Sequence, residues 1–126
     1  MKKYVTISNL SQPQTRPVLT RYCQSFLCRL RGLMFTRNID PEHGLLLVQK
    51  RDNRLDAAIH MLFVPIDLAV IWINQEKIVV DVCLARRWRL AYVPQKAACY
   101  VLETHPQRLP DFDIGDRVIF DETTLD

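Results

Sequence analysis

The sequence predicts an α+β domain that is mainly β: a compact, largely antiparallel, barrel-like sheet with one principal helix packed on it. Three observations favour this class. Six or seven short apolar runs are separated by turn residues, and only one stretch has a helical period. Gly115 and Asp116 form a turn signal directly before the last apolar run, as is common in small barrels. The 126 residues fit one domain, 1–126.

The first quarter of the chain predicts one strand and one helix. Residues 3–8 alternate weakly and predict a strand, and residues 12–17 form a polar connection marked by prolines. Over residues 19–31 the apolar positions follow an i, i+3, i+4, i+7 pattern, which predicts a helix whose stripe packs on the sheet. Gly32 is expected to cap this helix in a left-handed conformation. The predicted stripe is Leu19, Tyr22, Cys23, Phe26, Leu27 and Leu30.

The rest of the chain predicts strands joined by short turns. Pro65 removes a ladder donor and predicts a bend between two of these strands. Residues 86–95 are expected to form a long basic loop, residues 105–112 at most one helical turn, and residues 121–126 a frayed end. The predicted strands cover residues 45–48, 57–64, 67–73, 78–84 and 97–103, and a last strand ends at residue 120.

Composition and charge are those of an ordinary soluble domain. The net charge of +3 permits an acidic partner, but the chain lacks the dense basic stripe of a dedicated nucleic-acid binder. Nucleic acid is therefore expected to make weak, non-specific contact at most. The N-terminus has no apolar signal-peptide core, and the longest apolar stretch, residues 68–73, is too short to span a bilayer. These features predict a cytoplasmic protein without a membrane partner.

The four cysteines predict neither a disulfide nor a metal site. Cys23, Cys28, Cys83 and Cys99 include no Cys-x-x-Cys pair, and no histidine lies at zinc-finger spacing from them. On the predicted helix, the first two would point in different directions because they are five residues apart. We therefore expect four reduced thiols that act as small core residues, and we expect no metal or cofactor.

His60 and Asp67 are polar residues within apolar, strand-like runs, where a polar side chain costs free energy unless it is paired. His60 is either a core histidine with satisfied ring nitrogens or a group that contacts a ligand or transfers a proton. Asp67 either accepts backbone N–H bonds near the bend at Pro65 or lies beside His60 and orients its ring. Because one bend joins the two predicted strands, the two side chains are expected to converge.

The basic loop is the most promising segment for polar recognition. Guanidinium groups grip phosphate or carboxylate groups with two hydrogen bonds, and aromatic rings offer stacking surfaces. The alternative is a solvated loop with its tryptophan in the core. Arg29, Arg31 and Arg37 add to the positive patch only if the fold brings them near. The candidate residues in the loop are Arg86, Arg87, Trp88, Arg89 and Tyr92.

Taken in order and with their spacing, six segments resemble a widespread prokaryotic family, domain of unknown function 192. The resemblance spans about residues 16–120 and implies a small β-rich domain, but it supplies no activity, cofactor or catalytic residue. Many relatives carry an aromatic-Met-x-Asn-Thr segment where this chain has Ile59, His60 and Met61, so a role of that Asn-Thr pair does not transfer. The matching segments are residues 29–35, 44–47, 59–61, 65–67, 100–103 and 115–118.

Three functions remain open from the sequence. The favoured one is a small binding module whose cleft, near His60, Asp67 and the 86–89 loop, takes an anionic small molecule or peptide. The second is a hydrolase- or isomerase-like enzyme that uses His60 and Asp67 for acid–base chemistry. The third is weak, non-specific nucleic-acid contact through the arginines. The first is favoured because no complete catalytic set is visible.

Overall fold

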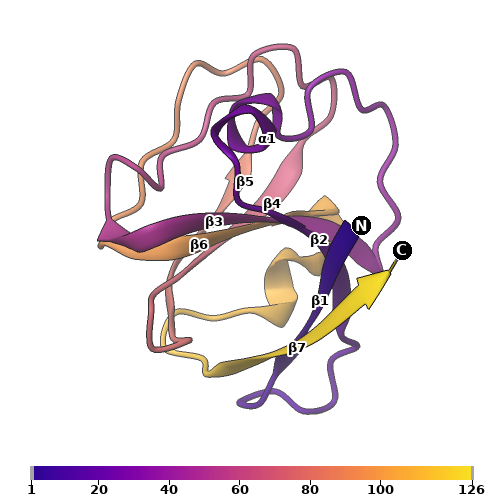
Figure 1. The fold of residues 1–126 in the computed structure, drawn as a ribbon, viewed down its shortest axis with the longest axis vertical. Coiled ribbons are helices and arrows are strands. Elements are labelled where there is room, and N and C mark those ends of the chain that lie inside the picture. Colours follow the sequence, from indigo (N-terminus) through magenta and orange to yellow (C-terminus); the bar gives the residue numbers. More distant parts are fainter. Residues whose placement is uncertain (1, 126) are drawn as a thin grey trace.

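The computed structural model describes residues 2–125 and consists of seven strands, one short α-helix and one 3₁₀ helix (Figure 1). The strands form one mixed sheet in the order β5-β4-β6-β3-β2-β1-β7. The elements are β1 (Lys2–Asn9), β2 (Val18–Cys23), α1 (Phe26–Arg31), β3 (His43–Asn53), β4 (Leu68–Ile73), β5 (Val79–Ala85), β6 (Ala98–Thr104), η1 (Pro106–Asp111) and β7 (Val118–Leu125).

The sheet is mainly antiparallel but contains one parallel pair and is not closed. β2 runs parallel to β3, whereas every other neighbouring pair is antiparallel. The two edge strands, β5 and β7, do not pair along their length; an isolated bridge between Ile78 and Arg117 and a few backbone bonds join the residues at one end. The predicted mainly β class is therefore confirmed, and the predicted barrel-like closure is corrected to an open, mixed sheet.

Each face of the sheet packs against its own apolar cluster. On one face, Leu45, Val70 and Trp72 pack with buried residues of the connection between β3 and β4, such as Met61. On the other face, Leu46 and Ile71 pack with residues from the η1 segment and from the edge strands β5 and β7. The alternation of inward and outward side chains along each strand produces these two layers. The central strands β3, β4 and β6 are consequently apolar on both sides.

The predicted helix over residues 19–31 is wrong in its first half. Val18–Cys23 is strand β2, and the α-helix is limited to Phe26–Arg31. A few apolar residues fit both helical and strand periods, and pairing with β1 and β3 decides the outcome. Phe26 is 68% exposed and α1 has no buried residue, so its stripe does not pack on the sheet as predicted. Gly32 does end the helix, with a φ of 47°.

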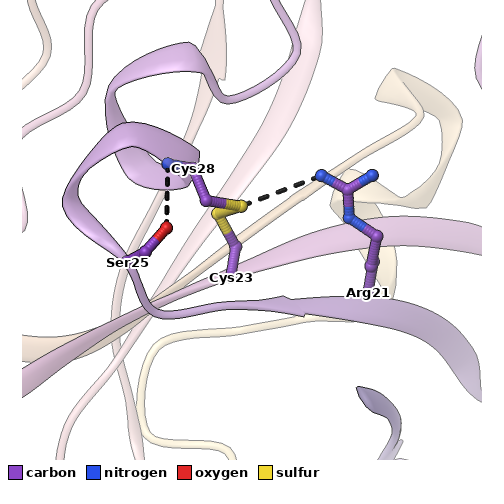
Figure 2. Close-up of a disulfide and its surroundings, with 4 residues drawn as sticks. All are labelled: Arg21, Cys23, Ser25 and Cys28. Atoms are coloured by element: carbon purple, nitrogen blue, oxygen red, sulfur yellow. Dashed lines mark hydrogen bonds between the residues drawn. A yellow bond between two sulfur atoms is a disulfide. The ribbon is translucent and has the colours of Figure 1, made fainter. Parts of the chain in front are cut away.

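The expectation of four reduced thiols is wrong for two of them. Cys23 ends β2 and Cys28 lies in α1, and the chain turns between them so that their sulfurs form a disulfide (Figure 2). The argument from directions on one helix does not apply, because Cys23 is not helical. The Ser25 hydroxyl accepts a hydrogen bond from the Cys28 N–H and caps the helix. The bond and the cap together fix α1 to the end of β2. Cys83 and Cys99 are free thiols.

Two further segments differ from their predictions. The predicted strand over residues 57–64 is an irregular connection, held to the 86–95 loop by a bridge between Ile59 and Tyr92. The frayed end predicted over residues 121–126 is strand β7 as far as Leu125, because it pairs with β1 along its length; Asp126 lies outside the described residues. The other predicted strands are confirmed, with β3 longer than expected. Within residues 2–125, no helix is long and apolar enough to cross a membrane.

Candidate functional site

The main cleft lies between α1, the middle of the sheet and the connection from β3 to β4. Its volume is about 640 Å³. Apolar residues from the core cluster form much of its wall, including Leu47, Ile59 and Val101. Four basic and two acidic side chains lie around them, together with two glutamines and a histidine. These polar residues are Arg29, Arg31, Lys50, Arg51, Asp56, Gln24, Gln49, His60 and Glu103.

Glu103 is a buried carboxyl group on the central strand β6. Its cross-strand neighbours are Leu45 on β3 and Val70 on β4, so apolar residues flank it on both sides. The residue is only 4% exposed, and it takes part in none of the ion pairs found among the described residues. Burial raises the pKa of Glu103 from 4.5 to about 7. Near neutral pH this carboxyl is therefore poised between its protonated and ionised forms.

The glycine that ends α1 leaves room beside this carboxyl. Gly32 has a left-handed backbone, and a β-carbon built on it would lie 3.6 Å from Oε1 of Glu103. A larger residue here would be strained and would also push a side chain towards the carboxyl. Gly44 allows the close approach of β3 to β6, because a β-carbon there would lie 2.7 Å from the backbone oxygen of Glu103. Gly32 thus lines the cleft beside Glu103, whereas Gly44 is not among the lining residues.

His60 and Arg29 line the cleft, and each has a buried side-chain nitrogen without a hydrogen-bond partner. The Nε2–H of His60 donates to the carbonyl of Leu30, 2.8 Å away, so the Nδ1 of the neutral ring is an acceptor. That Nδ1 is buried and has no partner. The Nη1 of Arg29 donates to Gln49, whereas its Nε–H is buried and unpartnered. These are the two unsatisfied buried side-chain nitrogens found in residues 2–125, and both line one cleft.

Asp67 does not line this cleft. It borders a second hollow of about 320 Å³, and its Oδ1 accepts hydrogen bonds from the backbone N–H and the Nε–H of Arg87. The backbone N–H of Arg87 is the main cause that lowers the pKa of Asp67, and the charge of Arg86 adds to it. Asp67 thus fastens the basic loop and does not orient His60. The backbone bonds come from that loop, not from the bend at Pro65.

The basic loop does not line the main cleft, although its backbone bonds to Ile59 and Met61 on either side of His60. Arg87 borders the second hollow, whereas Arg86, Trp88, Arg89 and Tyr92 line neither of the two. The hydroxyl of Tyr92 accepts from the Arg86 N–H and closes the loop on itself, and Trp88 is 53% exposed. Among the predicted binding residues, His60 and Arg31 are therefore brought together, and Asp67 and the loop are not brought to them.

Sequence reasoning missed Glu103 and Gln49 as site residues. For Glu103 the signal was present: it is a lone charged residue at the end of an apolar run from Ala98 to Leu102. Arg29 was expected to contribute only if the fold brought it near the basic loop, and it lines the main cleft instead. Gln49 carried no signal. The distance in sequence between α1 and β6 hides their proximity.

The two free thiols, Cys83 and Cys99, are half-buried and buried, respectively. Residues 2–125 contain no group of three or more His, Cys, Asp or Glu residues placed to hold a metal ion. Cys99 is buried, and its thiol donates to the carbonyl of Gln49, 3.0 Å away. Burial raises the pKa of Cys83 to about 11, which keeps that thiol protonated and weakly nucleophilic at neutral pH.

Comparisons with known proteins place the chain in a family. The profile of DUF192, described as "Uncharacterized ACR, COG1430", matches residues 8–120. A UPF0127 protein of Thermococcus gammatolerans is 41% identical over 101 residues, which cover 79% of this chain but 64% of that protein's length. A UPF0127 protein of Pyrococcus furiosus is 31% identical over 113 residues, which cover 87% of this chain and 93% of that protein.

The fold is also found in a solved structure. A protein of unknown function from Novosphingobium aromaticivorans DSM 12444 has a TM-score of 0.79 to this chain, and the match covers 92% of this chain and 83% of that one. The two sequences are 18% identical, so this likeness shows the fold alone.

Proposed function

The chain belongs to the DUF192 family, which is uncharacterised, and we propose from its site that the protein is a small binding module whose main cleft receives an anionic small molecule or peptide. The observation that carries the proposal is that two residues lining one cleft, Arg29 and His60, each have a buried nitrogen without a partner, Nε and Nδ1 respectively. A buried polar atom without a partner costs free energy in the empty protein, and a ligand that satisfies it recovers that cost.

The chemistry of the cleft specifies the kind of ligand. The Nε–H of Arg29 requires an acceptor, and a carboxylate or phosphate oxygen is the strongest one available. The Nδ1 of a neutral His60 requires a donor, such as a ligand hydroxyl or amide N–H. A protonated Glu103 donates its O–H to a second acceptor. The ligand therefore combines an anionic group with at least one hydrogen-bond donor.

Size and charge favour a small molecule over an extended peptide. A volume of about 640 Å³ lies within the usual range for small-molecule sites, roughly 300–1,000 Å³. Arg29, Arg31, Lys50 and Arg51 border the cleft, with Asp56 as the exposed acid among its lining residues. This positive rim attracts an anion and lowers the cost of desolvating it.

Calorimetric titration with inorganic phosphate and a panel of hydroxylated mono- and dicarboxylates at about pH 6 tests the proposal. We expect a saturable site, and Arg29→Gln should weaken binding by about tenfold or more because it removes a charged donor. The matched control is Arg16→Gln, an exposed arginine that pairs with Glu42 outside the cleft. The proposal fails if no probe binds, or if the two variants weaken binding equally.

The pH dependence of the same titration has a defined sign. As the pH rises through about 7, Glu103 ionises and repels an anionic ligand, so the affinity of the wild type should fall. Glu103→Gln stays neutral and should lose less affinity than the wild type over the same range. An equal fall in both proteins would show that Glu103 does not face the ligand.

One observation favours an acid–base enzyme as the second candidate function. A carboxyl group with a pKa of about 7 and an imidazole with an unpartnered Nδ1 line the same cleft, and these are the two side-chain types that most often serve as general acids and bases. The pair would be His60 and Glu103, since Asp67 borders another hollow. Turnover that is lost in Glu103→Gln while the ligand still binds would support catalysis, and binding without any turnover would support the binding module.

A further inference from the structure

Three connections form one layer over the α1 side of the sheet. They are residues 24–42, 54–67 and 86–97, and together they are called the loop layer here. Figure 1 shows them gathered with α1 on one side of β3 and β6. Backbone bonds tie them together: the Phe35 N–H donates to Phe63, and the Met61 N–H donates to Arg89. The layer is thus one continuous surface built from three distant parts of the chain.

This layer exposes most of the large apolar side chains on the surface. Fourteen large hydrophobic side chains are exposed in the part of the chain that the structure describes, and ten of them lie in the loop layer. Leu90 is 74% exposed. Ordinary surfaces scatter such residues singly, whereas a concentration on one side marks a contact surface. The ten are Phe26, Leu27, Leu30, Phe35, Leu55, Leu62, Phe63, Trp88, Leu90 and Val93.

Three of these residues form an aromatic cluster held by unusual backbone. The rings of Phe35 and Phe63 stack at 5.6 Å between centroids, and Trp88 meets Phe63 edge-on at 5.8 Å. All three have left-handed backbones, with φ of 64°, 59° and 67°. This conformation costs free energy for a bulky residue and is retained where the surroundings require it. Here this conformation holds three aromatic rings at the surface, where they contribute little burial free energy to folding.

The layer is also the positive side of the molecule. Its three connections contain eight Lys and Arg against four Asp and Glu, a net charge of +4. The whole chain has +3, so the remaining residues have −1. Arg86, Arg87 and Arg89 flank Trp88 directly. The surface that exposes apolar side chains is therefore also the surface that attracts anions.

We propose that the loop layer is a docking surface for an anionic lipid bilayer. Aromatic and leucine side chains that insert at the headgroup boundary, surrounded by arginines, are the features that bind proteins to such surfaces. Single-stranded nucleic acid fits less well. Its bases stack on aromatic rings, and this kind of binding does not account for exposed leucines such as Leu27, Leu55 and Leu90. Peripheral docking needs no spanning helix. The proposal does not depend on the ligand of the main cleft.

Vesicle co-sedimentation of the whole protein tests this proposal. The probes are vesicles of phosphatidylcholine alone and vesicles that also contain phosphatidylglycerol. We expect binding to the anionic vesicles that is at least about tenfold stronger and that weakens as salt is added. Trp88 provides an independent signal, because Trp72 is buried at 1% exposure and does not meet the lipid. The fluorescence should shift to the blue on anionic vesicles, and Trp88→Phe should abolish the shift.

A matched pair of variants separates the surface from the overall charge. Leu90→Glu and Ile114→Glu remove similar apolar side chains and add the same charge, but Ile114, 60% exposed, lies outside the loop layer. We expect Leu90→Glu to weaken vesicle binding by about tenfold or more and Ile114→Glu to change it little. Equal effects of the two variants, or equal binding to both kinds of vesicle, would overturn the proposal. So would saturable binding of a single-stranded oligonucleotide without any vesicle binding.

Discussion

Replacing Glu103 by glutamine should make the protein more stable at alkaline pH. In the unfolded chain the carboxyl ionises at about 4.5, whereas in the folded protein burial holds its pKa at about 7. Between these two values the folded state keeps a proton that the unfolded state has lost, so stability falls as the pH rises. The contribution of Glu103 to stability is therefore greatest below pH 4.5, and its loss is complete above about pH 7. Glutamine keeps the shape of the protonated form and has no such titration.

The magnitude follows from the size of the shift. At about 1.4 kcal/mol per pKa unit, the wild type loses about 3 kcal/mol of stability across this window. Glu103→Gln should therefore match the wild type near pH 4 and exceed it by about 3 kcal/mol near pH 8.5, which corresponds to roughly 10 °C in Tm. Other groups titrate equally in both proteins and cancel in the difference.

Urea unfolding, followed by circular dichroism at a series of pH values, measures this difference. The control is Glu76→Gln, which removes the same group from an exposed turn and should give a small difference at every pH. A difference between wild type and Glu103→Gln that stays within about 0.5 kcal/mol from acid to alkaline pH would refute the reasoning. It would mean that the carboxyl is solvated or paired in solution.

Three further predictions concern the elements around the cleft. Phe26→Ala should cost less than about 1 kcal/mol in urea unfolding, because the ring is 68% exposed; a cost of about 3 kcal/mol would place it in the core. Reducing the bond between Cys23 and Cys28 should cost about 2 kcal/mol, because the bond closes a short loop in the unfolded chain; an unchanged midpoint under reducing conditions would contradict this. Asp67→Asn should leave the affinity of the cleft for an anion unchanged, whereas His60→Ala should weaken it. If calorimetry shows that Asp67→Asn weakens binding and His60→Ala does not, Asp67 contacts the ligand and His60 does not.

Much of the sheet could be predicted because its strands carry their own signals. β1, β4, β5 and β6 are apolar or alternating runs bounded by turn residues, and the structure has them within one or two residues of the predicted positions. β2 could not be recognised, because its apolar positions also continue a helical period into α1. What makes it a strand is pairing with β1 and β3, which is information about other parts of the chain.

The candidate site was predicted in part, for a related reason. His60 stood out because a histidine inside an apolar run needs a partner, and it does line the main cleft. Its expected partner, Asp67, was chosen for nearness in sequence, but residues 57–64 do not form a strand, and the bend at Pro65 does not bring the two into one cleft. The groups that share the cleft, Arg29 and Glu103, come from α1 and β6, and only the folded sheet brings them together.

The most direct test of the binding cleft is a nitrogen-15 NMR titration that observes the Nε–H of Arg29 and the ring of His60. The probe is a hydroxylated dicarboxylate added at about pH 6, where Glu103 is mostly protonated. The account predicts that both signals shift together and reach saturation, while the Nε–H signals of Arg16 and Arg87, outside the main cleft, stay in place. If all the arginine signals drift in parallel without saturation, the anion is only screening surface charge and the cleft is not a binding site.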